Sequence, residues 1–152
     1  MPTPRSLRDP RGRQAILERL AQLSPAHTRR WGKMDVSQML PHLASSLRLA
    51  LGEEGLTMNP PGPLKAAIVR LLAVHYVPWP KGKIPAPPGA FSTPSEGWEK
   101  DRAIVVELIE RFAAAAPESL GKQHPAFGNM KLHDWDVLMY RHIDHHLRQF
   151  GA

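Results

Sequence analysis

Proline is the residue that most constrains how this chain can fold. The 152 residues include sixteen prolines, and a proline inside a helix or a central strand removes a backbone hydrogen bond. Six of the sixteen fall within residues 75–95, so this segment is expected to be neither regular helix nor central strand. We expect a long ordered connection or a lid there. Several of the other prolines stand where helices are expected to begin or end.

Between these prolines, apolar residues recur at the spacing of amphipathic helices. The pattern predicts helices over 10–23, 35–51, 63–74, 93–116 and about 133–150. Asp9 followed by Pro10 is a good helix start, and Asp35 with Gln38 three residues later resembles a capping box. Pro41 lies inside the second predicted helix, where we expect a kink or a loosened turn.

The fourth and third predicted helices rest on different signals. Thr93-Pro94-Ser95-Glu96 combines a cap, a first-turn proline and a capping-box glutamate, so the fourth helix is expected to begin there. The third is supported by apolar residues at helical spacing, namely Leu64, Ala67, Ile68, Leu71 and Leu72. No internal repeat and no clear alternating strand pattern is visible. The sequence therefore predicts one all-α domain over residues 1–152, with four or five helices.

Composition excludes several kinds of site and partner. The chain has no cysteine, so thiolate metal sites, disulfides and a cysteine nucleophile are ruled out, and any metal must be held by nitrogen and oxygen. The net charge is +6, but the excess of basic residues is confined to two short patches without interleaved aromatic residues. This distribution favours a solvated basic surface over nucleic-acid binding. No signal peptide or membrane-spanning stretch is evident. We expect a soluble, cytoplasmic protein without a membrane or nucleic-acid partner.

Histidines near the C-terminus carry the strongest chemical signal. His142 and His146 are one helical turn apart, which rotates them by only about 40° around the helix. They continue the apolar line of Leu138 and Trp135, so they should face the interior. Buried imidazoles need partners for a donor and an acceptor, and a shared divalent metal ion is one such partner. His42, on an unusually polar face of the second predicted helix, is the expected third ligand.

The alternatives to a metal site remain open at this point. A buried histidine is often only a hydrogen-bonded core residue, and an isolated H-x-x-x-H occurs by chance on exposed helices. Gln38 and Gln149 are candidates to orient an imidazole or to line the pocket, or to make ordinary interhelical hydrogen bonds. His145 is expected at the pocket edge or in solvent, and His124 at the pocket mouth or as an anchor of its loop. The remaining histidines, His27, His75 and His133, are expected in loops or at the surface. The aromatic residues Tyr76, Trp79 and Phe91 are candidates to roof an apolar pocket or to cover the end of the bundle.

Three segments resemble a known family. RWGKMDVSQMLPHL at 30–43, HPAFG at 124–128 and WDVLMYRHIDHHLRQFG at 135–151 resemble the DinB-like (YfiT-like) superfamily of metal-binding helical bundles, and within it an uncharacterised bacterial subfamily. The resemblance covers nearly the whole chain. It implies a four-helix bundle core with a long crossover connection and an additional short helix, and frequent homodimers. It also implies a zinc, nickel or related divalent ion on His42, His142 and His146.

Three histidines leave at least one open position on a zinc-like ion, which is typical of catalytic rather than structural sites. The resemblance implies a metal-dependent transferase that uses low-molecular-weight bacterial thiols, or a hydrolase, acting on a small molecule. A non-catalytic metal or ligand-binding protein and a dimerising scaffold are the alternatives. Because unperturbed histidine titrates near 6.5, metal binding is expected to weaken below about pH 6.

Overall fold

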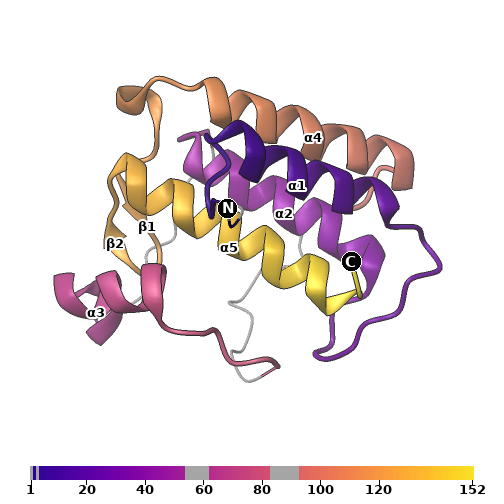
Figure 1. The fold of residues 1–152 in the computed structure, drawn as a ribbon, viewed down its shortest axis with the longest axis horizontal. Helices are drawn as coiled ribbons and strands as arrows, with labels where there is room; N and C mark the ends of the chain where they lie inside the picture. Colours follow the sequence, from indigo (N-terminus) through magenta and orange to yellow (C-terminus); the bar gives the residue numbers. More distant parts are fainter. Residues whose placement is uncertain (1, 3, 54–61, 83–92) are drawn as a thin grey trace.

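The computed structural model of this chain describes residues 2, 4–53, 62–82 and 93–152. The described residues form an all-α fold with one very short β-hairpin (Figure 1). The long helices are α1 (Pro10–Gln22), α2 (Val36–Ala50), α4 (Trp98–Ala114) and α5 (Leu132–Gln149). Helix α2 packs against α4 and α5, and α1 packs against the same two helices. The predicted all-α class is therefore confirmed.

The first two helices begin where the sequence predicts. The Asp9 carboxylate accepts from the Arg11 N–H at 2.8 Å, and Pro10 takes the first helical position, where its missing N–H costs nothing. Asp35 and Gln38 form a reciprocal capping box, with distances of 2.9 and 3.0 Å. Helix α2 continues through Pro41 as one α-helical segment. Gly52, at φ +74°, follows its end.

The predicted start of the fourth helix is wrong. Helix α4 begins at Trp98, after Gly97 at φ +109°. Asp101, within the first turn, accepts hydrogen bonds from the Ser95 hydroxyl at 2.5 Å and from the Glu96 N–H at 3.0 Å. Thr93 instead shares a 2.9 Å hydrogen bond with the Ser45 hydroxyl of α2. A carboxylate inside the helix thus fixes the preceding segment, in place of a cap before it.

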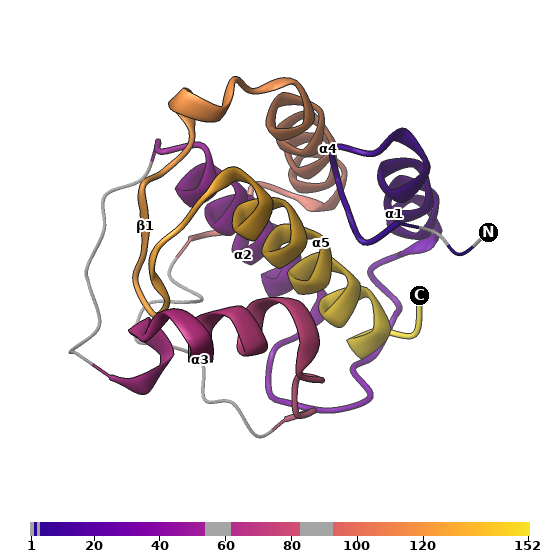
Figure 2. The same ribbon diagram turned by 60° about the vertical axis from the view of Figure 1, so that its left-hand side comes forward.

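The connection from α2 to α4 also differs from the prediction. The single helix expected over 63–74 is divided into η1 (Pro63–Lys65), α3 (Ala67–Leu71) and the π-helix η2 (Leu72–Tyr76). Ala66, with ψ 133°, is extended and separates the first two. Figure 2 shows α3 outside the group formed by the four long helices. Four large apolar residues of η1, α3 and η2 are exposed rather than buried, namely Leu64, Ile68, Leu71 and Leu72.

The connection or lid predicted over 75–95 lies largely outside the described residues, because only 75–82 and 93–95 of it are described. The loop before α5 contains the strands β1 (Gln123–His124) and β2 (Gly128–Asn129), which pair antiparallel. A shorter turn, η3 (Pro117–Ser119), follows α4. The hairpin was not expected from the sequence, since two-residue strands are too short to show alternation.

The core lies between the four long helices. From α4 it includes Val105, Leu108, Ile109 and Phe112, and from α5 it includes Trp135, Leu138 and Met139. The buried carboxylate of Asp136, also on α5, accepts from the Ser6 hydroxyl at 2.6 Å and the Leu7 N–H at 2.7 Å. The segment before α1 is thereby fixed to α5. Among the described residues, no helix is long and apolar enough to cross a membrane.

Candidate metal centre

Three histidines from two helices meet at one point of the core. Nε2 of His142 lies 3.0 Å from Nε2 of His42 and 3.0 Å from Nε2 of His146. One ligand atom from each of the three lies within 4.8 Å of the others. The imidazole planes are inclined to one another by 88°, 88° and 68°. The nitrogens therefore converge while the rings spread outward.

Local structure explains this convergence. His142 and His146 share one face of α5 because they are one turn apart, and His146 is only 8% exposed. His42 comes from α2, which packs against α5. Pro41, directly before it, is buried and does not move His42 away from the other two. The arrangement agrees with the spacing predicted from the sequence.

Gln149 fixes the orientation of one ring. Its amide oxygen lies 2.7 Å from Nδ1 of His146, so Nδ1 carries the proton and Nε2 presents a lone pair to the cluster. The Gln149 amide nitrogen donates to the Trp31 carbonyl at 2.9 Å. Gly32 makes room for this amide, because a Cβ on Gly32 would lie 2.7 Å from its nitrogen. The sequence-based expectation that Gln149 orients an imidazole agrees with this geometry.

The nitrogen geometry fits an ion better than a set of hydrogen bonds. A neutral imidazole nitrogen has one in-plane position, either a proton or a lone pair, yet Nε2 of His142 faces two nitrogens at equal distance. Two nitrogens bound about 2.1 Å from a tetrahedral zinc ion would be about 3.4 Å apart. The observed 3.0 Å is close to this value. A small adjustment of the rings would accommodate a divalent ion.

Burial keeps two of the three rings uncharged. It lowers the pKa of His142 well below the usual 6.5, and the neighbouring His146 and His42 lower it further. Burial also lowers the pKa of His146 to about 3, with a further contribution from His42 that outweighs the opposing hydrogen bond to Gln149. Neutral imidazoles are the form that binds metals. The lone pairs therefore stay available at neutral pH.

Aromatic and basic side chains lie along one side of the cluster. The Trp79 ring is 6.4 Å from the His142 ring and 5.9 Å from the His145 ring. The Trp31 ring is 5.6 Å from that of His145, and His145 in turn lies 5.3 Å from His146. The Lys81 ammonium lies 4.9 Å above the Trp31 ring. We call these four residues, Trp31, Trp79, Lys81 and His145, the rim of the cluster.

Two of the predicted pocket residues have other contacts. The amide oxygen of Gln38, an exposed residue, accepts from the Asp35 N–H in the capping box. His124 anchors its own hairpin, because Nδ1 accepts from the Ala126 and Phe127 N–H groups at 3.0 and 3.2 Å. Burial lowers the pKa of His124 to about 4. In the described part of the chain, neither residue makes a hydrogen bond to a ring of the triad, although the proximity of His124 contributes slightly to the lowered pKa of His142.

One surface prediction is wrong. The His75 side chain is only 8% exposed and binds the Asp134 carboxylate at 2.9 Å. Its ring also stacks on His133, with centroids 4.9 Å apart. The sequence could not show this contact, because 59 residues separate the two partners and no motif links them. His133 is exposed, and Phe91, expected near the pocket, lies outside the described residues.

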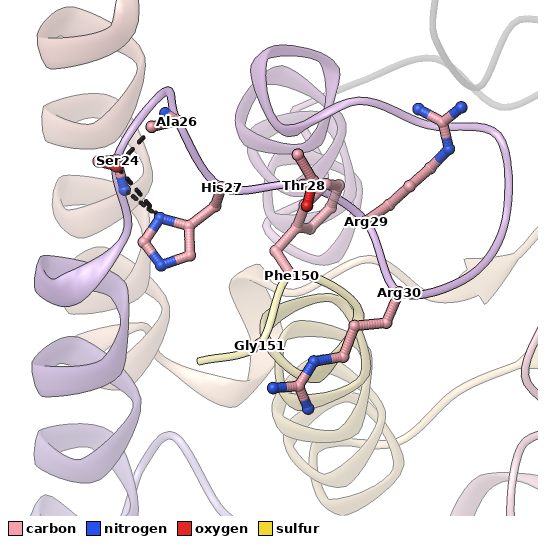
Figure 3. A pocket seen from close by; sticks show the side chains of 8 residues that line it. All are labelled: Ser24, Ala26, His27, Thr28, Arg29, Arg30, Phe150 and Gly151. Carbon is pink, nitrogen blue, oxygen red and sulfur yellow. Dashed lines mark hydrogen bonds between the residues drawn. The ribbon is translucent and has the colours of Figure 1, made fainter.

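A shallow depression of about 440 Å³ lies elsewhere on the surface. It is lined by the loop after α1 and the end of α5, and its residues are Ser24, Ala26, His27, Thr28, Arg29, Arg30, Phe150 and Gly151 (Figure 3). The His27 ring faces Ser24, whose N–H it accepts at 3.0 Å. Arg29 and Arg30 extend in different directions (Figure 3). Because their guanidinium groups do not converge, we assign no site to this depression.

Sequence reasoning missed Trp31 and Lys81 as neighbours of the cluster. Trp31 stands in the quoted 30–43 segment, but no spacing rule relates it to the final helix. Lys81 belongs to the proline-rich segment, whose course cannot be inferred from periodicity. Of the aromatic residues expected to roof the pocket, Trp79 lies beside the His142 ring. Tyr76, suggested with it, is 69% exposed.

The comparisons with known proteins give one match. A family model described as "Protein of unknown function (DUF1569)" matches residues 1–152. A search of curated proteins and a search of solved structures each found no match.

Proposed function

The chain belongs to the DUF1569 family of proteins of unknown function, so its function must be inferred from its own residues, and we propose that it binds one divalent metal ion through His42, His142 and His146. The convergence of three imidazole nitrogens on one point is the observation that carries this proposal. Zinc or nickel suits such a set, because imidazole is a preferred ligand of both.

The surroundings support an ion with an open position. Three protein ligands leave at least one place for water or substrate on a zinc-like ion, as in catalytic sites. When bound, such an ion acts as a Lewis acid that lowers the pKa of a water or thiol ligand. The Gln149 contact holds His146 in the tautomer that binds metal, and burial lowers the pKa of both His142 and His146, so these two rings are neutral at pH 7. These features favour a metal-dependent enzyme of the thiol-transferase or hydrolase kind.

The relation to the DinB-like superfamily belongs to the same proposal. One histidine from α2 and two from α5, one turn apart, are arranged as the resemblance implies. A non-catalytic metal or ligand-binding protein is the alternative, and it would use the same three residues. The homodimer, the bacterial thiol and the cytoplasmic location stay predictions.

The first test measures metal content in protein purified without a histidine tag. Replacement of His42, His142 or His146 by alanine should reduce bound metal from about one ion per chain to a small fraction, because each removes one of three ligands. The control His27→Ala, at the surface depression, should keep its metal. Undiminished metal in all three variants would contradict the assignment.

A thiol-conjugation and ester-hydrolysis screen of the metal-loaded protein then separates an enzyme from a binding protein. Turnover favours the enzyme, whereas tightly bound metal without turnover favours the binding protein.

A further inference from the structure

Charge around the triad is unbalanced once an ion is bound. All three imidazoles are neutral ligands, and among the described residues no carboxylate makes a hydrogen bond or ion pair with His142 or His146. Asp144, the acidic residue between them in sequence, binds Arg19 at 2.7 Å and Arg148 at 3.1 Å instead. On the α5 side of the cluster, no described carboxylate would offset the charge of a divalent ion. Since a buried charge without a counter-charge is costly, the open position favours an anionic ligand.

A second positive charge stands on the rim. The Lys81 ammonium forms no ion pair in the described part of the chain, and its closest recorded contact is the face of the Trp31 ring. Lys81 is exposed, so its ammonium can be reached from solvent.

An unused hydrogen-bond donor lies beside this charge. The indole N–H of Trp31 is buried and has no partner among the described residues. Buried donors are seldom left without an acceptor, because the unmade hydrogen bond costs free energy. The loop that carries Lys81 packs against the loop that carries Trp31, since a Cβ on Gly82 would lie 3.7 Å from the Gly32 nitrogen and 3.8 Å from the Trp31 side chain. The donor and the ammonium therefore belong to one small region.

We propose that the ligand of this site is a small molecule with two anionic ends. One end binds at the open position of the metal, and the other, a carboxylate or similar oxyanion, binds the Lys81 ammonium and the Trp31 indole N–H. This inference rests on the proposed metal centre and names the substrate class for it. An oxyanion is the group that satisfies both an ammonium and an N–H donor, because it accepts several charge-assisted hydrogen bonds.

A matched pair of ligands tests the second end. The protein is first loaded with cobalt(II), and its metal content is measured. 3-Mercaptopropionate and its uncharged amide, 3-mercaptopropanamide, are then titrated, with binding followed by the cobalt absorption and by calorimetry. Both thiols offer the same sulfur to the metal. The wild-type protein should bind the carboxylate at least about tenfold more tightly, as expected for a charge-assisted hydrogen bond.

Variants assign that preference to residues. Lys81→Met and Trp31→Phe should each reduce the preference to about threefold or less with metal content unchanged, whereas Lys81→Arg should keep it. Lys100→Met, which removes an exposed lysine of α4 paired with Glu96, is the control for net charge and should also keep it. Melting temperatures show whether each variant is folded.

The outcomes separate the two proposals. Wild-type protein that takes up no metal would overturn the metal centre, and the two-ended ligand with it, before any thiol is added. Metal-loaded protein that binds both thiols equally would overturn the two-ended ligand alone. A carboxylate preference that survives in both Lys81→Met and Trp31→Phe would likewise overturn it.

Discussion

Gln149 shows how much a single side chain contributes to this cluster. It is 4% exposed and contacts the His146 ring with its oxygen and the Trp31 carbonyl with its nitrogen. One residue thus sets a histidine tautomer and holds the loop that bears Trp31. Partners that orient a metal-binding histidine commonly affect metal affinity almost as much as the ligands do.

Replacing Gln149 should therefore weaken the metal site without removing a ligand. Gln149→Leu leaves the His146 Nδ1–H without an acceptor, so metal affinity should fall by about 10- to 100-fold. Gln149→Glu keeps an acceptor for His146 and should remain within about tenfold of the wild type. Competition with a chromophoric chelator measures both. Equal losses in the two variants would mean that the contact to Trp31, not the one to His146, is what matters.

At the scale of elements, α5 organises the molecule. Besides the two ligand histidines it carries Asp136, which holds the segment before α1, and Asp134, which binds His75 of η2. Burial acts to raise the pKa of Asp134, but hydrogen bonds from His75 and the Lys131 backbone outweigh it and lower the pKa. Arg141 of α5 donates to the carbonyls of Ala73, Val74 and Val77. One helix therefore fixes both the cluster and the segment that leads to its rim.

The start of α4 gives a test at this scale. Asp101 is 5% exposed, and Asp101→Ala would leave the Ser95 hydroxyl and the Glu96 N–H without their acceptor. The free energy of unfolding should fall by about 1–3 kcal/mol. Thr93→Ala, which removes the one hydrogen bond to Ser45, should cost about 1 kcal/mol or less. Chemical denaturation compares the two. A larger loss for Thr93→Ala would mean that the contact to Ser45, not the Asp101 carboxylate, mainly holds the segment before α4.

At the scale of the whole molecule, burial changes how pH acts on the metal site. The sequence alone suggests that protons displace the metal below about pH 6, because free histidine titrates near 6.5. In the fold, the pKa of His146 is lowered to about 3 and that of His142 lies well below 6.5. At a pH between the lowered and the unperturbed pKa, each of these histidines binds a proton in the unfolded chain but not in the folded chain. The free energy of unfolding of the apo protein should therefore fall as pH falls below 6.5.

The predicted outcome is a metal effect that persists in mild acid. The apo protein should melt at a lower temperature at pH 5 than at pH 7.5. Equimolar zinc should raise the melting temperature at both values, because burial lowers the pKa of His142 and brings that of His146 to about 3, and a ligand that binds only the folded state stabilises it. Paired thermal melts of metal-depleted and zinc-loaded protein measure this. A zinc effect seen at pH 7.5 and absent at pH 5 would mean that these histidines titrate close to 6.5.

The local sequence determined the helices that have strong signals of their own. Asp9 with Pro10, and Asp35 with Gln38, cap α1 and α2 as predicted, because a cap acts within three residues of the chain. The one-turn spacing of His142 and His146 set their common face for the same reason. His42 could be proposed as their partner because an inward histidine on a second helix is how bundles hold metals.

Only the tertiary structure decided the contacts between distant segments. Ser95 and Glu96 bind Asp101 rather than capping a helix with Thr93, and the apolar residues around Ile68 are exposed because α3 lies outside the four long helices. The His75 side chain is buried where it binds Asp134 of α5. Trp31 and Lys81 come together beside His145 from two loops whose course follows no periodic pattern. The lowered pKa values of His142 and His146 come mainly from burial, a property of the packed helices. A helix cap or a one-turn spacing depends only on residues that are close in the sequence. Desolvation and contacts between loops depend on how the rest of the chain packs around them.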